Sequence, residues 1–286
     1  MGITAASNTL SLMAQGKLGK TTTELSTTFE RLSSGMRINK ASDDPAGLAL
    51  ADGLHAQATI ATVAIRNAND GLSVTAITDQ ALAQVGDILV RLGELATQSA
   101  NGVYTEVQRS ALSTEFLALG SEVERIAATT TFNGINLLSN SSAISFQVGL
   151  TSGSNAVITM ASVVGTLSAL GIGTGGRLTY SVIAATGGST ESQSAARNAL
   201  DAVNNAIATL GTARGTIGAV ESRLNVAVNN LVSSRDNFMQ AESRIRDADI
   251  AQEAANMVRL QVLQQAGTAV IAQANQQPKL VLDLLR

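Results

Sequence analysis

Cysteine and tryptophan are absent from the 286 residues, proline occurs twice, histidine once, and aromatic side chains make up only 2%. The missing cysteine excludes disulfides, thiolate catalysis and cysteine metal sites. With His55 as the single histidine, a metal site built on an HExxH pair is excluded as well. A wide globular core draws on large aromatic side chains, so an apolar content of 45%, mostly aliphatic, favours narrow helix–helix contacts.

A strong charge of one sign is also lacking. The net charge is −3, so no basic surface points to nucleic acid or to an anionic membrane. No stretch of about twenty apolar residues is apparent, because the nearest approach, 258–274, contains Arg259 and four glutamines; we therefore expect no membrane insertion. Residues 1–19 lack a basic start followed by an apolar run, so we expect no cleaved signal peptide.

One apolar repeat dominates the second half of the chain. From residue 196 to residue 245 an apolar side chain recurs every seven residues, which predicts a coiled-coil helix roughly 75 Å long. We call these residues the α-helical seam: Ala196, Val203, Leu210, Ile217, Leu224, Leu231, Phe238 and Ile245. The positions offset by four hold Leu200, Ile207, Arg214, Glu221, Val228, Arg235 and Glu242. Their four charged members either face solvent or pair with neighbouring helices and set the register.

The first half predicts three further helices. An N-terminal helix is expected to end at Gly35, which suits a left-handed terminus. The Asp43-Asp44-Pro45 sequence predicts an N-cap and first turn for a long helix that stops at Asn101. Thr105 with Gln108 is a capping box for the third helix, whose apolar face is Leu112, Phe116, Leu119, Val123 and Ile126.

The middle of the chain changes its periodicity. Asn133-Gly134 predicts a tight turn, and the runs 144–148, 157–159 and 178–183 are prone to form strands. We expect a hairpin-bearing insert over 139–191, followed by a second capping box at Thr190 and Gln193. A last helix is expected from about Ile245 to Pro278, with its seam at Leu260, Leu263, Gly267, Val270 and Ala274.

The predicted fold is mainly α, with long antiparallel helices in coiled-coil or bundle packing and a small β-hairpin insert. No nucleophile–base pair or metal cluster stands out, so we expect neither an enzyme nor a cofactor. Asp43 and Asp44 are better explained as helix caps than as paired catalytic carboxylates. The glycines at 171–176 lack the Lys-Ser/Thr that follows a phosphate-binding loop.

Two long stretches resemble bacterial flagellins. Residues 29–52, FERLSSGMRINKASDDPAGLALAD, resemble the N-terminal flagellin signature, and residues 243–286 are similar to the flagellin C-terminus through its Leu-Leu-Arg end. The stretches ELATQSANG (94–102) and TTTFNG (129–134) also match flagellin patterns. The resemblance spans about 1–138 and 192–286, with the motifs in the family's order.

The resemblance implies a structural subunit of the extracellular bacterial flagellum that serves motility. Such a subunit is exported through the growing flagellum and polymerises into a helical filament with identical or sister subunits, with an export chaperone and a filament cap as further partners. The implied domains are inner-tube helices at 1–43 and 245–286, outer-tube helices at 44–138 and 192–244, and a variable β-rich insert at 139–191. The implied assembly seam is Leu18, Leu25, Phe29, Leu32, Leu260, Leu263 and Val270.

The resemblance also implies an outside partner. Many flagellin monomers contact an animal Toll-like receptor, and the matching positions here are Arg91, Leu95 and Glu115, with Arg91 and Leu95 on one helix face. Val90 and Gly93 stand where recognised members usually carry Gln and Arg, which predicts weaker binding. The alternative is that Arg91 forms a salt bridge within its own subunit or filament.

Two other functions remain open from the sequence. A hook–filament junction protein also resembles flagellin at both ends, although residues 94–102 and the C-terminal match favour flagellin itself. A coiled-coil signalling or adhesion module is a second alternative, and it predicts a membrane segment or signal peptide.

Overall fold

The computed structural model describes residues 8–163, 165–184 and 188–284, with side chains up to residue 276. The last two residues of the predicted Leu-Leu-Arg end therefore lie outside the described residues. The predicted order of three helices, a β-containing middle and two helices is confirmed. The described helices are α1 (Thr9–Ser34), α2 (Pro45–Ala100), α3 (Glu106–Thr129), α4 (Ser189–Arg246) and α5 (Ile250–Leu284), with a 3-10 turn at Ser154–Ala156. The chain is 73% helical, so the mainly α fold class is confirmed.

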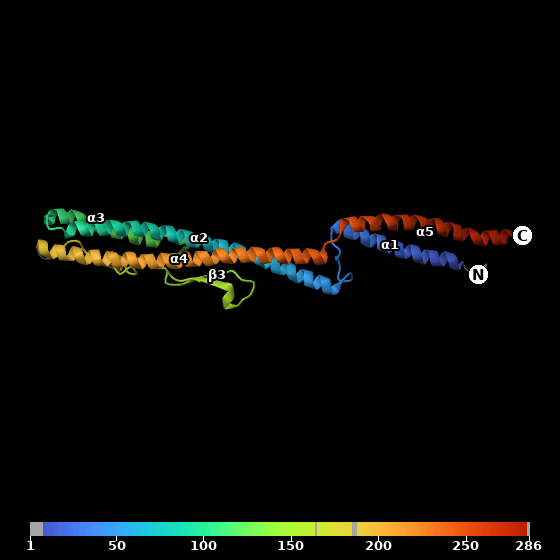
Figure 1. The fold of residues 1–286 in the computed structure, drawn as a ribbon, viewed down its shortest axis with the longest axis horizontal. Helices are drawn as coiled ribbons and strands as arrows, with labels where there is room; N and C mark the ends of the chain where they lie inside the picture. The colour runs from blue at the N-terminus through green and yellow to red at the C-terminus, as the bar shows by residue number, and fades with distance from the viewer. Residues whose placement is uncertain (1–7, 164, 185–187, 285–286) are drawn as a thin grey trace. The chain divides into compact units, whose positions relative to one another are not determined.

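The chain divides into two compact units. Unit 1 comprises residues 1–58 and 235–286, and unit 2 comprises residues 59–234. In unit 1, α1 and α5 are antiparallel neighbours (Figure 1), because Asn8 donates its side-chain amide to the Ala274 carbonyl at 2.9 Å while Arg31 reaches Glu253 at 3.4 Å.

The helix ends in unit 1 follow the sequence signals. Gly35 adopts the left-handed conformation, with φ at 72°, and its N–H caps the Arg31 carbonyl at 2.8 Å. Asp44 caps α2 by accepting the Gly47 N–H at 2.9 Å. The prediction for the other end of the chain is wrong: α5 continues through Pro278 to Leu284, and it begins at Ile250, after a break that follows Arg246.

The core of unit 2 is shared by α2, α3 and α4. The six seam residues from Ala196 to Leu231 are buried, which confirms that part of the predicted seam; Phe238 and Ile245 are half-buried. The second row of the seam was wrongly assigned. It follows each seam residue by three positions rather than four and consists of Ala199, Ala206, Ala213, Val220 and Ala227, buried or half-buried.

Small side chains explain that second row. Gly86 on α2 lies under Leu210, and Gly71 lies under Leu224, with an added Cβ meeting either leucine at 3.2 Å. The helices therefore approach too closely for large residues in every row. Of the charged positions at offset four, Arg214 and Glu221 are exposed, whereas Arg235 and Glu242 are half-buried.

Among the residues that the structure describes, the middle of the chain contains three antiparallel strand pairs rather than one hairpin. They are β1 (Thr131–Phe132) with β2 (Ile135–Asn136), β3 (Ile144–Gln147) with β4 (Val157–Met160), and β5 (Gly173–Thr174) with β6 (Arg177–Leu178). Asn133 and Gly134 form the predicted turn, with φ at 50° and 78°. The strand expected over 178–183 is confined to its first residue, because later residues such as Val182 enter the core.

Both capping predictions can be checked in unit 2. The Thr105–Gln108 box is formed at the start of α3. The box at Thr190 and Gln193 is not, because α4 already begins at Ser189 and the carboxylate of Glu191 accepts the Gly188 N–H at 2.9 Å.

One described helix, α2, is long and apolar enough to cross a membrane by length and composition alone. This departs from the expectation that the sequence contains no such stretch. Core helices pass the same test, and α2 supplies Leu82, Leu89 and Leu92, all fully buried, to the core of unit 2.

Candidate assembly surfaces

The pair of helices α1 and α5 has an inner face that is covered within the chain. Leu25 and Thr28 on α1 and Leu260 on α5 are buried there. Leu18 lies over Gly267, where an added Cβ would meet its Cδ1 at 3.4 Å. The heptad of α5 that faces α1 runs Leu260, Gln264, Gly267, Ile271 and Ala274, all buried or half-buried.

The same pair carries an outer apolar face that no described residue covers. Leu263 and Val270 expose 49% and 57% of their area, although both continue the apolar repeat of α5. The other large apolar side chains exposed on these two helices are Leu10, Leu12, Met13, Phe29, Ile250, Val258 and Val262. An exposed apolar surface of this extent is typical of a protein–protein contact.

The seven predicted seam residues therefore divide between two faces. Leu25 and Leu260 are buried, and Leu18 and Leu32 are half-buried. Phe29, Leu263 and Val270 point outward. The apolar repeat did not identify the inner face of α5, because two positions of that face, Gln264 and Gly267, are not apolar.

The predicted receptor residues are only partly brought together. Arg91 donates to the Glu115 carboxylate at 2.8 Å and to Glu94 at 2.8 Å. The hydrogen bonds that Arg91 donates to Glu94 and to Glu115 raise the pKa of its guanidinium above the ordinary value. Leu95 is fully buried in the core of unit 2, so the expected exposed face shared by Arg91 and Leu95 does not exist.

Two of the four charged positions at offset four pair with α2. Arg214 forms a two-point contact with Asp79, at 2.8 and 3.1 Å, which holds the pKa of that carboxyl below its ordinary value. Glu242 contacts the Nδ1 atom of His55 at 3.2 Å. Arg235 instead pairs with Asp236 on its own helix. Arg214 and Glu242 thus pair with the neighbouring helix, whereas Arg235 does not.

Chemistry-bearing clusters are sparse in the described part of the chain. No group of three or more His, Cys, Asp or Glu residues that could hold a metal ion occurs among the described residues. Asp43 accepts the backbone N–H groups of Lys40 and Asn39, which lower the pKa of its carboxyl. Of the glycines at 171–176, Gly175 and Gly176 form the turn between β5 and β6, with φ at 59° and 78°.

Sequence reasoning missed one important buried residue, Arg109 on α3. It is fully buried and donates to the Ser99, Asn101 and Tyr104 carbonyls and to the Ser189 hydroxyl. Its position in the apolar repeat of α3, seven residues before Phe116, was a signal for burial. Arg109 thereby fixes the connection between α2 and α3 to the start of α4.

A mainly helical chain with paired terminal helices and an uncovered apolar face defines the class of self-assembling structural proteins. Comparison with protein families agrees. Residues 6–143 match the bacterial flagellin N-terminal helical region and residues 200–285 the bacterial flagellin C-terminal helical region. The chain belongs to the bacterial flagellin family and is a structural subunit of the flagellar filament, outside the cell.

Individual relatives support the same assignment. The flagellin of Halalkalibacterium halodurans is 38% identical over 259 residues, covering 90% of each chain. Flagellin FlaB1 of Treponema pallidum is 33% identical over 286 residues, covering 98% of each. A solved structure of a putative flagellar hook-associated protein from Vibrio parahaemolyticus has a TM-score of 0.58 at 18% identity, over 72% of this chain and 100% of that one, and shows a shared fold.

Proposed function

We propose that this chain polymerises through the outer apolar face of the α1–α5 pair. That face is the observation that supports the proposal, because Leu263, Val270 and Phe29 on it are exposed to water. Exposed apolar area is unfavourable in free energy, and contact with further copies would bury it. Assembly with identical or sister subunits follows from the family. Export through the flagellum without a cleaved signal, and recognition by an export chaperone and a filament cap, belong to the same proposal.

The domain assignment is proposed on the same basis. Residues 1–43 and 245–286 form the inner-tube part, and 44–138 with 192–244 form the outer-tube part. The two compact units support this division, although their boundaries lie within α2 and α4. The insert at 139–191 is not a separate body, since Leu167, Ile172 and Val182 are buried in the core of unit 2.

The chain acts as a structural protein and not as an enzyme. The flagellin family is a family of structural proteins, and the acidic pair Asp43 and Asp44 is occupied in capping backbone N–H groups. The relatives named flagellin favour a filament subunit over a hook–filament junction protein. A signalling or adhesion module has no support from these relatives.

Receptor recognition is proposed for Arg91 and Glu115 alone, since Leu95 lies in the core. Their mutual ion pair has to open before either side chain contacts a receptor. Binding of the monomer to the receptor ectodomain is expected to weaken in Arg91→Ala and Glu115→Ala. Unchanged binding in both variants would leave these residues to the subunit's own structure.

A pair of substitutions three residues apart tests the assembly face. Leu263→Asp places a charge on the outer face, so we expect an unchanged thermal melt of the monomer and a critical concentration for polymerisation raised at least tenfold. Leu260→Asp places the charge on the inner face and should melt the α1–α5 pair in the monomer itself. Filaments of Leu263→Asp at the wild-type critical concentration would contradict the proposal.

A further inference from the structure

Methionine sulfur is the group of this chain that peroxide oxidises most readily. Cysteine is absent, so no thiol competes for the oxidant, whereas methionine occurs six times. Oxidation converts the apolar thioether of methionine into a polar sulfoxide. The flagellar filament lies outside the cell, so peroxide in the surroundings reaches its subunits without crossing a membrane.

The methionines differ widely in their exposure to water. Met13 on α1 exposes 70% of its area, and Met239 on α4 exposes 53%. Met36 and Met257 are half-buried, and Met160 in unit 2 is buried. Among the described residues, peroxide therefore has its freest access to Met13.

Met13 belongs to the outer apolar face of the α1–α5 pair. Asn8 on α1 contacts the Ala274 carbonyl of the antiparallel helix α5. Met13 follows Asn8 by about 7.5 Å along α1, and Val270 precedes Ala274 by about 6 Å along α5. The exposed side chains of Met13 and Val270 are therefore at nearly the same level of the pair. Oxidation of Met13 would place a polar group on the surface proposed for assembly.

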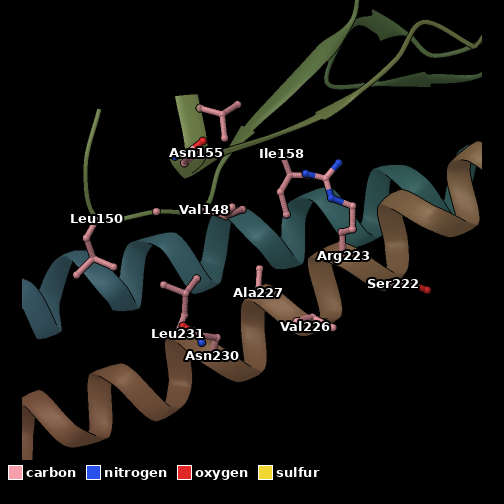
Figure 2. A pocket seen from close by; sticks show the side chains of 12 residues that line it. Val148, Leu150, Asn155, Ile158, Ser222, Arg223, Val226, Ala227, Asn230 and Leu231 are labelled. Carbon is pink, nitrogen blue, oxygen red and sulfur yellow. The ribbon is translucent and has the colours of Figure 1, made fainter. Parts of the chain in front are cut away.

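The exposed apolar surface of unit 2 offers no comparable target. None of the large apolar side chains that the structure describes as exposed in unit 2 is a methionine. The open hollow of about 600 Å³ between α4 and the β3–β4 hairpin (Figure 2) is lined by aliphatic side chains such as Val148, Leu150 and Val226. Peroxide thus alters exposed apolar side chains of unit 1 and leaves those of unit 2 unchanged.

We propose that Met13 is a site of reversible oxidation by peroxide, and that its sulfoxide prevents the free subunit from joining the filament. This inference rests on the proposed assembly through the outer apolar face. Burying a polar group without a hydrogen-bond partner is costly, so the sulfoxide opposes a contact that the thioether favours. In the filament further copies cover Met13, and the incorporated subunit is protected from the oxidant.

The oxidation needs only the methionine and one molecule of hydrogen peroxide. The thioether sulfur attacks one peroxide oxygen, so an S–O bond forms while the O–O bond breaks. Sulfur loses two electrons and the peroxide gains them. The departing hydroxide takes up the proton left on the transferred oxygen and leaves as water. A methionine sulfoxide reductase supplied with a thiol reverses the change.

Treatment of the full-length monomer with hydrogen peroxide, followed by removal of the oxidant and polymerisation, tests the site. Treated wild type should have a critical concentration raised about tenfold or more. Met13→Leu keeps an apolar side chain of similar size and forms no sulfoxide at this position, so treatment should leave its critical concentration unchanged. The matched control, Met239→Leu, retains Met13 and should lose assembly as the wild type does.

The outcomes separate this site from the proposed function. Failure of the untreated wild type to polymerise contradicts the filament function itself. The oxidation site is overturned if peptide mass spectrometry finds no sulfoxide at Met13 in the treated monomer. It is also overturned if the fully oxidised wild type polymerises at the untreated concentration, or if treated Met13→Leu loses assembly equally.

Reversal and protection provide a second measurement on the wild type alone. A sulfoxide reductase with dithiothreitol should restore the critical concentration of the oxidised monomer. Met13 in preformed filaments should oxidise more slowly than Met13 in the monomer, whereas Met160 should stay unoxidised in both. Assembly that the reductase does not restore, or equal oxidation rates of Met13 in filament and monomer, would overturn the proposal.

Discussion

Among single residues, Arg109 carries an unusual share of the local hydrogen bonding. It satisfies three carbonyl groups and a hydroxyl from a fully buried position. Arg109→Met keeps much of the volume but leaves those carbonyl groups unpaired, so we expect unit 2 to lose about 2–4 kcal/mol of unfolding free energy.

Arg125→Met is the matched control for that change. Arg125 lies on the same helix but pairs with Glu122 in solvent, where such a pair contributes about 0.3–0.5 kcal/mol. Denaturant unfolding of both variants, followed by circular dichroism, measures the difference. Equal losses of unfolding free energy in the two variants would show that the buried hydrogen bonds of Arg109 stabilise unit 2 no more than an exposed ion pair does.

The Asp79–Arg214 pair predicts a defined pH dependence. Hydrogen bonds from Arg214 lower the pKa of folded Asp79 below its ordinary 3.8, so the unfolded chain takes up a proton first as the pH falls. The pair's contribution is complete above pH of about 4 and is lost as the pH drops through the lowered value. Because both side chains are well exposed, we expect Asp79→Asn to cost under about 1 kcal/mol at pH 7.

That cost should shrink steadily as the pH is lowered from about 4 toward 2. Unfolding free energies of the wild type and Asp79→Asn, measured across this range, test the sign. A difference that grows on acidification would mean that the pair does not stabilise the folded state.

At the scale of elements, much of the helical layout could be predicted from the sequence. The six buried seam residues, the cap at Asp44 and the Asn133-Gly134 turn each follow from local rules that tertiary packing does not override. What periodicity could not supply was the second row of α4, because alanines signal close helix approach only once the opposing glycines of α2 are known.

Two glycines predict opposite effects on stability. Gly149→Ala should destabilise the β3–β4 hairpin, since the new methyl group would meet the Ala156 backbone. Gly53→Ala, on α2, meets nothing within 4 Å and should stabilise its helix by up to about 1 kcal/mol. Thermal melting of both variants checks this. A melting temperature of Gly149→Ala at or above that of the wild type would mean that the hairpin end is not tightly packed.

The candidate sites were less predictable than the elements. Leu95 has the same helical phase as buried Leu92 and Ala96, so the repeat of α2 already favoured the core over a receptor contact. In α5 the predicted seam mixed residues of the inner face with residues of the outer face, because apolar residues recur at intervals of three and four on both faces. Only the position of α1 distinguishes Leu260 from Leu263.

At the scale of the whole molecule, the two units differ in how far their stability depends on assembly. The core of unit 2 draws on α2, α3, α4 and the insert, all within residues 59–234. The α1–α5 pair of unit 1 covers only its inner face and leaves an apolar outer face in water. Unit 2 is therefore expected to fold without the polymer, whereas the terminal helices gain most from assembly.

The most direct test of this account is the polymerisation of the chain with residues 255–286 deleted, followed by sedimentation and electron microscopy beside the full-length chain. We predict that the full-length chain regrows filaments after acid dissociation. The truncated chain should remain a soluble monomer that still shows the melting transition of unit 2. Long filaments of the truncated chain under the same conditions would contradict the claim that the terminal helices carry assembly.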